Sequence, residues 1–425
     1  MARQGMRGYG AAAVRVWISM YVLYLMSTIY RSTNAVMAPE WRAELGLAPD
    51  QLGMITAAFY FAFACAQIPA GLSLDRFGPR WTIAGMMLLP VIGGFLLSQA
   101  DEFGELALAQ AFMGAGCAIG LSGAIVVFAR WFAPDRMATL IALYSGLGNV
   151  GILLSATPLA ASVEAFGWRD TFLVLTAINV VLVLQLVVFV RDAPPGHPFH
   201  ARRRETLVDI LRGAIEVWRE PAIRPLLAIM FCSLGIVLTV RALWAGPYLA
   251  DVHGLDTIER GNMLLLFTVF MLIGNVGAGP LDRIFDTRKG VCMAGAAATV
   301  VTLAALAFIP EPPLWLAMAL FCAFGLFCNY VVTVLAQGRA LFPERLVGRV
   351  ITLMNAANFF GGTCLLLGSG YLIRAFPTEA GRVPAEAYRA LFGALAVMVA
   401  LALFAYSKSR DVPPSAERAR LSQKS

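Results

Sequence analysis

The most regular feature of the sequence is a series of apolar runs, each about 20 residues long, separated by short charged segments. A helix needs about 20 mostly apolar residues to cross the hydrocarbon core of a bilayer. Each run therefore predicts one membrane-spanning helix, and twelve can be read along the chain, at residues 13–38, 51–70, 81–99, 105–129, 138–161, 170–190, 223–250, 260–279, 290–309, 313–336, 348–372 and 387–407. The pattern predicts an all-α integral membrane protein.

The composition agrees with this prediction. Of the 425 residues 59% are hydrophobic and only 14% are charged, whereas an ordinary soluble domain is about 25% charged. Such a chain is neither soluble nor disordered, because it carries far more apolar side chain than a soluble interior can hold. The 7 cysteines fall inside the apolar runs without CxxC spacing, so we expect small hydrophobic residues and no metal, disulfide or cofactor.

The basic residues are distributed unevenly between the two sides of the predicted membrane. With twelve spans both termini lie on one side, and that side holds 25 of the 33 Lys and Arg residues. Cytoplasmic loops are enriched in such residues, so we expect both termini in the cytoplasm and a multi-pass protein of the cytoplasmic (inner) membrane. The net charge of +7 is then a topology signal, and no nucleic-acid partner is expected.

The second half of the chain repeats the first. Residue pairs about 208 positions apart recur in the same order, among them Gly46 and Gly254, Gly53 and Gly261, Asp75-Arg76 and Asp282-Arg283, Pro134 and Pro343, and Asn149 and Asn358. The repeat predicts two six-helix bundles related by pseudo-two-fold symmetry about the membrane normal. The expected domains are an N-terminal bundle at 1–190, a cytoplasmic linker at 191–222 and a C-terminal bundle with a cytoplasmic tail at 223–425.

One motif makes a family resemblance specific. The segment between the second and third spans, from Gly71 through Asp75-Arg76 and Gly78 to Arg80, resembles the G-x-L-x-D-R-x-G-R-R signature of the major facilitator superfamily (MFS). A degraded second copy contains Asp282 and Arg283. The resemblance covers the whole chain and implies a bacterial-type transporter in which two bundles rock around a central site.

The resemblance also implies a gate at the cytoplasmic side. Asp75 would contact the partner bundle there, where a helix N-terminus favours an anion, with cationic partners close by. The predicted gating and motif residues are Gly71, Asp75, Arg76, Gly78, Arg80, Arg130, Asp282 and Arg283. Pro79 and Trp81 replace the basic residues that are usual in the family. The alternative is that these are ordinary loop charges.

Two arginines are the strongest candidates for substrate contact. Arg31 and Arg241 lie 210 residues apart, in the first and seventh spans, each followed by a long uncharged stretch. A charge inside a span costs about 2.5–3.5 kcal/mol and is a functional hypothesis by default. Two guanidinium groups facing the central cavity that the resemblance implies would suit an anion, because each can bind an oxyanion with two hydrogen bonds. The alternative is that both reach outward to the interface.

Further polar and aromatic residues share helix faces with these arginines or line other spans. The remaining predicted substrate-binding residues are Tyr24, Thr28, Asn34, Trp244, Tyr248, Asn149, Asn358 and Asn329. Asn329, Thr333 and Gln337 form a polar stripe, interpreted as a cavity wall. For the aromatic residues the alternative is an interfacial belt, and for Asn149 and Asn358 it is helix–helix hydrogen bonding.

These features favour a secondary carrier of a small organic anion, acting as a functional monomer. No Asp, Glu or His lies in the middle of a span, which favours exchange, uniport or a substrate that carries its own proton. Export of amphipathic compounds is one alternative, although Gln110 stands where the drug/proton antiporters of this family carry Arg. Nitrate or nitrite transport is another, although the Arg residues of that family on spans two and eight are missing here. No catalytic constellation points to an enzyme.

Overall fold

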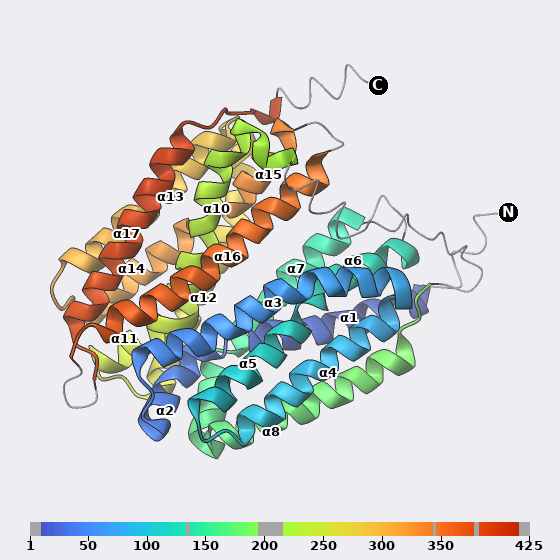
Figure 1. Ribbon diagram of the computed structural model, residues 1–425, viewed down its shortest axis with the longest axis horizontal. Helices are drawn as coiled ribbons and strands as arrows, with labels where there is room; N and C mark the ends of the chain where they lie inside the picture. Colours follow the sequence, from blue (N-terminus) through green and yellow to red (C-terminus); the bar gives the residue numbers. More distant parts are fainter. Residues whose placement is uncertain (1–9, 133–136, 194–215, 343–345, 378–381, 416–425) are drawn as a thin grey trace. The chain divides into compact units, whose positions relative to one another are not determined.

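The computed structural model describes residues 10–132, 137–193, 216–342, 346–377 and 382–415, and these are almost entirely helical. Figure 1 shows the helices as bundles of long, roughly antiparallel rods. The first half contains α1 (Gly10–Tyr30), α2 (Asn34–Leu45), α3 (Pro49–Phe77), α4 (Pro79–Ser98), α5 (Phe103–Cys117), α6 (Ile119–Trp131), α7 (Met137–Leu154) and α8 (Thr157–Phe189). The second half contains the 3₁₀ turn η3 (Pro221–Ile223), α10 (Arg224–Val237), the π-helix η4 (Leu238–Trp244), α11 (Ala245–Asp251), α12 (Thr257–Ile284), α13 (Arg288–Phe308), α14 (Leu314–Phe327), α15 (Val331–Leu341), α16 (Val347–Arg374) and α17 (Ala385–Ser407).

Two compact units divide the chain. Unit 1 lies within Met1–Leu45 and Ala58–Arg204, and unit 2 lies within Gly46–Ala57 and Glu205–Ser425. The first turns of α3 therefore belong to unit 2, where Arg374 Nη1 at the end of α16 lies 2.6 Å from Asp50 Oδ2.

Eleven helical stretches in the described residues are long and apolar enough to cross a membrane. One of them, Leu143–Phe189, has 47 residues and covers two of the predicted spans, 138–161 and 170–190. Its helices are separated between α7 and α8, and α8 is interrupted again at Gly167, whose φ of 78° places it in the left-handed region that favours glycine. The eleven stretches thus accommodate the twelve predicted spans.

Breaks occur at corresponding places in the two halves. The fourth predicted span is interrupted between α5 and α6, and the tenth is interrupted between α14 and α15. The first span breaks at residues 31–33, and the seventh changes to a π-helix over Leu238–Trp244. Pro39 follows the break at residues 31–33, and Pro247, 208 residues later, follows the π-helix over Leu238–Trp244. A proline removes one helical hydrogen bond and crowds the preceding turn, which favours such breaks.

Helix packing is also repeated within each unit. In unit 1 α4 packs against α5 and α8, and in unit 2 α13 packs against α14 and α17, as Figure 1 shows. The Gly114 position on α5 faces the backbone of Phe59 so closely that a Cβ would overlap it, and the equivalent Gly325 faces the ring of Phe267. Small residues permit this close approach, which matters in lipid because helices gain little there from hydrophobic burial.

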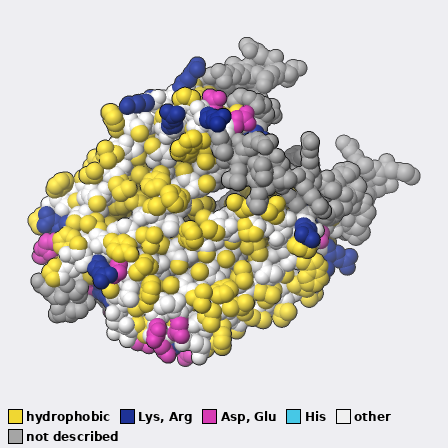
Figure 2. All heavy atoms as spheres, viewed as in Figure 1, with side chains coloured by type: hydrophobic (Ala, Val, Ile, Leu, Met, Phe, Trp, Pro, Cys, Tyr) yellow, Lys and Arg dark blue, Asp and Glu magenta, His cyan; other side chains and the backbone are white. Residues whose placement is uncertain are grey.

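The surface of the described helices is apolar over most of its visible area, as Figure 2 shows, and the charged side chains gather toward helix ends. Large apolar side chains are exposed along the helices, including Val188 at 70% and Val276 at 71%. A soluble protein rarely exposes contiguous apolar surface on this scale, so the structure agrees with a bilayer as the solvent.

Candidate functional site

Arg31 lies in the break between α1 and α2. Its backbone carbonyl accepts a hydrogen bond from Tyr60 Oη on α3 at 2.9 Å, and its guanidinium carbon lies 5.5 Å from the centre of the Phe63 ring. The side chain is half-buried. A cation over an aromatic face is stabilised by about 0.5–2 kcal/mol, depending on how far it is desolvated. The structure therefore places this charge within unit 1, against α3.

A buried polar cluster follows directly on the α2 side of the break. Asn34 Oδ1 accepts hydrogen bonds from Gln110 Nε2 on α5 at 3.0 Å and from Thr33 Oγ1 at 3.4 Å. Gln110 is fully buried, and its Oε1 has no hydrogen-bond partner. A buried amide oxygen without a hydrogen-bond partner lowers the stability of the fold. Gln110 is thus an incompletely satisfied neutral group at the position where drug/proton antiporters of the family carry Arg.

Arg241 occupies the equivalent place in unit 2, inside the π-helix η4. The residue is 4% exposed, and its Nε donates to Thr268 Oγ1 on α12 at 2.9 Å. The Thr268 hydroxyl in turn donates to the Leu264 carbonyl at 2.7 Å. A buried guanidinium requires hydrogen-bonding partners, and π-helical turns are frequent at functional sites.

The two arginines contact neighbouring helices at equivalent positions of the two repeats. Tyr60 and Thr268, which contact Arg31 and Arg241, are themselves 208 residues apart. In each unit the arginine of the first span thus contacts the second span at the same point. The chemistry differs, because Tyr60 contacts a backbone carbonyl and Thr268 contacts the guanidinium.

The aromatic residues predicted near Arg241 belong to the interior of unit 2. Trp244 is fully buried and donates Nε1–H to Ser369 Oγ at 2.8 Å. The Tyr248 ring lies edge-on to the rings of Tyr388 and Phe392, with centroids 5.4 Å and 5.7 Å away. Both residues are core residues, so the alternative of an aromatic belt facing lipid does not hold for them.

Tyr24 and Thr28 lie where α1 packs on α7. Tyr24 stacks on Tyr144 with a centroid distance of 4.6 Å, and Thr28 Oγ1 donates to the Leu25 carbonyl at 2.8 Å. A Cβ at Gly148 would overlap the Tyr24 ring, and one at Gly151 would overlap the Thr28 hydroxyl. The glycine-rich segment of this span therefore serves close helix packing.

The predicted asparagines have different surroundings. Asn358 Oδ1 accepts from the Leu234 backbone N–H at 3.0 Å, and Asn329 Nδ2 donates to the Met271 carbonyl at 3.0 Å, whereas Asn149 is half-buried on α7. Gln337, at the end of the predicted polar stripe, is fully buried and donates to the Arg410 carbonyl at 2.7 Å. Asn329 and Gln337, two of the three residues of the stripe, thus donate to backbone carbonyls within unit 2.

The motif after the second span connects to the end of α8. Gly78 has a φ of 80° and a Cβ there would lie 2.7 Å from Asp192 Oδ2, so only glycine fits. Asp192 Oδ1 accepts from the Arg80 backbone N–H at 2.7 Å, and Arg130 Nη1 donates to the Asp192 carbonyl at 3.5 Å. Asp192 therefore holds the N-terminus of α4, where a carboxylate is favourable.

The other motif residues lie at the same end of α3. Gly71 has open space around it, and the Arg76 guanidinium lies 5.3 Å from the centre of the Phe77 ring. Asp75 is in the last turns of α3, and its side chain lies outside the described part of the chain. The predicted gate contact of Asp75 therefore stays a prediction.

Unit 2 repeats this arrangement with a second carboxylate. Asp411, beyond α17, accepts from Thr287 Oγ1 at 2.5 Å and from the Lys289 N–H at 3.1 Å, at the start of α13. Asp282 forms an ion pair with Arg288 at 3.5 Å, while Arg283 is exposed. The sequence analysis did not include Asp192 and Asp411, although Arg191–Pro195 and Arg410–Pro414 both read R-D-x-P-P and would have revealed them.

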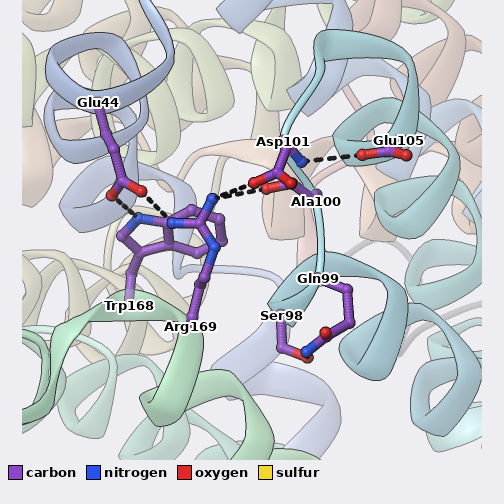
Figure 3. A network of polar contacts seen from close by, with 8 residues as sticks. All are labelled: Glu44, Ser98, Gln99, Ala100, Asp101, Glu105, Trp168 and Arg169. Atoms are coloured by element: carbon purple, nitrogen blue, oxygen red, sulfur yellow. Dashed lines mark hydrogen bonds and ion pairs between the residues drawn. The ribbon is translucent and has the colours of Figure 1, made fainter.

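A further polar network, absent from the sequence predictions, lies at the opposite end of unit 1 (Figure 3). Glu44 at the end of α2 accepts from Trp168 Nε1 at 2.6 Å and pairs with Arg169, which also contacts Asp101 Oδ1 at 2.7 Å and the Ala100 carbonyl at 2.9 Å. Partial burial alone would raise the pKa of the Glu44 carboxyl. The hydrogen bonds from Trp168 and Arg169 and the charge of Arg169 outweigh this effect and hold that pKa below its ordinary value of 4.5.

The equivalent positions in unit 2 form hydrogen bonds to neighbouring groups. Asp251, 207 residues after Glu44, accepts from Tyr388 Oη at 2.6 Å, and Arg389 Nε donates to the Ala307 carbonyl at 2.9 Å. Ala307 is the equivalent of Ala100. No group of three His, Cys, Asp or Glu within the described ranges could hold a metal ion.

Comparison with known proteins agrees with these features. The sequence profile described as "Major Facilitator Superfamily" matches residues 20–278 and 242–424. A probable sulfoacetate transporter of Cupriavidus necator is 26% identical over 299 residues, which are 67% of this chain and 68% of that protein. A probable L-galactonate transporter of Escherichia coli is 22% identical over 84% of this chain and 82% of its own. A probable nitrate/nitrite transporter of Mycobacterium tuberculosis is 26% identical over 86% and 90%.

The fold is also that of solved transporters. The crystal structure of a bacterial homologue of the human lysosomal transporter Spinster superimposes with a TM-score of 0.76. The match covers 97% of this chain and 98% of that chain at 16% sequence identity, and it shows the fold alone. With the family profile spanning nearly the whole sequence, the chain belongs to the major facilitator superfamily and is a multi-pass membrane transporter of small solutes, not an enzyme.

Proposed function

We propose that this transporter moves a small organic anion across the membrane by alternating access, with Arg31 and Arg241 recognising the anionic group. One observation carries the proposal: in each unit the first span departs from the α-helix at an equivalent place, and an arginine lies there. These are Arg31 in the break between α1 and α2 and Arg241 in the π-helix η4. Discontinuous helices form the substrate sites of many secondary transporters, and interrupted backbone at membrane depth is tolerated only where it is buried in protein or lines a water-filled cavity.

The chemistry of arginine supports an anion. A guanidinium stays charged and its planar array of donors matches a carboxylate or sulfonate. Two of the relatives are probable transporters of sulfoacetate and L-galactonate, which are organic anions. The relative named for nitrate and nitrite supports a second candidate, an inorganic oxyanion.

Uptake of labelled compounds into liposomes containing the purified protein tests the proposal. The panel should include a carboxylate, a sulfonate, nitrate, a neutral sugar and an amphipathic cation, each with and without an imposed pH gradient. We expect the carboxylate or sulfonate to be transported. Transport of only the neutral sugar or the cation would contradict the proposal.

Charge removal at the two arginines is the sharper test. Hydrogen bonds to charged groups contribute about 1.5–3 kcal/mol, so Arg31→Gln and Arg241→Gln should each weaken anion binding by roughly tenfold to several hundredfold. Arg382→Gln is the matched control, because Arg382 is exposed in the segment before α17. Equal affinity in all three variants and the wild type would remove both arginines from the site.

We further propose that Asp75 and its neighbouring arginines form a gate on the side predicted to be cytoplasmic. The support is the motif itself and the contact network that Arg80 and Arg130 make at the same end of unit 1. Asp75→Asn should preserve expression and folding but slow transport. The control Asp170→Asn, at an exposed position, should leave the transport rate unchanged. Wild-type rates in Asp75→Asn would remove the gate assignment.

A further inference from the structure

A groove between the end of α3 and the start of α4 has no role in the transport proposal. It is lined by Ser73, Phe77, Trp81, Thr82, Gly85 and Met86, and its volume is about 350 Å³. That space equals roughly a dozen water molecules at about 30 Å³ each. It can hold a polar headgroup or the upper part of one acyl chain, but not a whole lipid.

The rim of the groove combines exposed aromatic rings with cations. Phe77 is 60% exposed and Trp81 is 58% exposed. The Arg76 guanidinium lies 5.3 Å from the Phe77 ring centre, and that of Arg80 lies 5.0 Å from the Trp81 ring centre. Tryptophan and arginine side chains in this combination are typical of the membrane interface, where rings lie at headgroup level and cations face anionic lipid.

The floor of the groove contains a polar group without a partner. Thr82 is 6% exposed, and its buried Oγ1 has no hydrogen-bond partner. The Nε of neighbouring Arg80 is also buried and unpartnered, although the Nη2 of this guanidinium donates to the Val187 carbonyl. A hydroxyl in a helix ordinarily satisfies itself on the preceding turn, so an orphaned donor lining an open groove indicates a ligand with acceptor oxygens.

From these three observations we propose that the α3–α4 groove is a binding site for an anionic phospholipid. The lipid phosphate accepts from Thr82 Oγ1 and the arginine donors, and the upper acyl chain lies on Trp81 and Met86. The groove is at the end of unit 1 predicted to face the cytoplasm, where anionic lipid gives the leaflet a negative surface potential. The site also accounts for Trp81, which departs from the basic residue usual at this place in the motif.

Lipid binding to the purified full chain tests the site directly. Phosphatidylglycerol and phosphatidylcholine of identical acyl composition should be titrated into the detergent-solubilised protein and bound lipid counted by native mass spectrometry. We expect a preference for phosphatidylglycerol of about tenfold, because both lipids offer the same phosphate but the choline cation of phosphatidylcholine cancels the net negative charge that the two rim arginines attract. Equal binding of the two lipids, or saturation by inorganic phosphate with no lipid preference, would overturn the proposal.

Two variants localise the effect. A Cβ at Gly85 meets no atom within 4 Å, so Gly85→Leu fills the groove without disturbing the fold, and Gly277→Leu is its control on α12, where a Cβ also meets nothing. Gly85→Leu should lose the preference because it excludes both lipids from the groove, whereas Gly277→Leu should retain it. The near-isosteric Thr82→Val should weaken the binding of both lipids, because they share the phosphate that Thr82 contacts. An unchanged preference in Gly85→Leu would show that the lipid binds elsewhere.

Quenching of tryptophan fluorescence supplies a second readout. Lipid brominated in the acyl chains should quench wild-type fluorescence more as phosphatidylglycerol than as phosphatidylcholine. That difference should vanish in Trp81→Phe and persist in Trp315→Phe, because Trp315 is 71% exposed at the start of α14 and remote in sequence from the groove. A difference that survives in Trp81→Phe would contradict the placement of the lipid at this ring.

Discussion

Arg31 and Arg241 occupy equivalent positions in the two halves, yet the structure holds them differently. Arg31 lies in a short turn, half-buried, with its charge against the Phe63 ring. Arg241 lies within a π-helical segment that interrupts the α-helix, buried, with its Nε bonded to Thr268. The repeat has therefore conserved the place of the charge and the discontinuity of the helix, while the contacts that hold each guanidinium have diverged.

The largest expected difference concerns replacement by lysine. Arg241→Lys loses the Nε–H that bonds to Thr268 and puts a strongly hydrated ammonium in a buried place, whereas Arg31→Lys keeps a cation beside an aromatic ring. We expect Arg241→Lys to weaken anion affinity by about tenfold or more and Arg31→Lys by clearly less. Binding measured on the purified protein checks this, and a greater loss in Arg31→Lys would reverse the comparison.

An intermediate effect is expected at the two capping aspartates. Asp411 accepts from the Thr287 hydroxyl and the Lys289 N–H, while Asp192 accepts from the Arg80 N–H. Loss of a cap costs about 0.5–2 kcal/mol, so Asp411→Ala should lower the thermal midpoint more than Asp192→Ala. Thermal unfolding in detergent measures both, with Asp170→Ala as an exposed control. Equal midpoints for the two variants would show that the number of accepted bonds does not matter.

The smallest effect is expected from Glu44. Its folded-state pKa is lowered, so its stabilising contribution is complete at neutral pH and is lost as the pH falls below about 4.5. The two side chains of the pair with Arg169 are 31% and 48% exposed, and ion pairs open to solvent contribute about 0.2–1 kcal/mol. The thermal midpoint of Glu44→Gln should therefore fall less than that of the wild type between pH 7 and pH 4.

The exposed Glu164 provides the control for this measurement. Glu164→Gln should show the same acid dependence as the wild type, because no hydrogen bond or ion pair described here depends on it. A wild-type response in Glu44→Gln as well would indicate that the network of Figure 3 adds nothing to stability.

Much of the architecture could be predicted from the sequence. The spacing of apolar runs predicted the all-helical membrane fold, because a bilayer admits few ways to satisfy a backbone. The motif from Gly71 to Arg80 predicted the family, and the residue pairs 207–210 positions apart predicted a repeat whose contacts recur in both units, as at Phe59 and Phe267.

Only the tertiary structure decided which polar side chains serve packing and which remain candidates for substrate. Trp244, Tyr248 and Gln337 share helix faces with the predicted site, yet they bond to or pack on neighbouring helices of unit 2. A helical pattern tells which residues share a face, but not which helix that face meets. The partners of Asp192, Glu44 and Thr268 lie 27 to 125 residues away in sequence, so those contacts exist only once the bundle has formed.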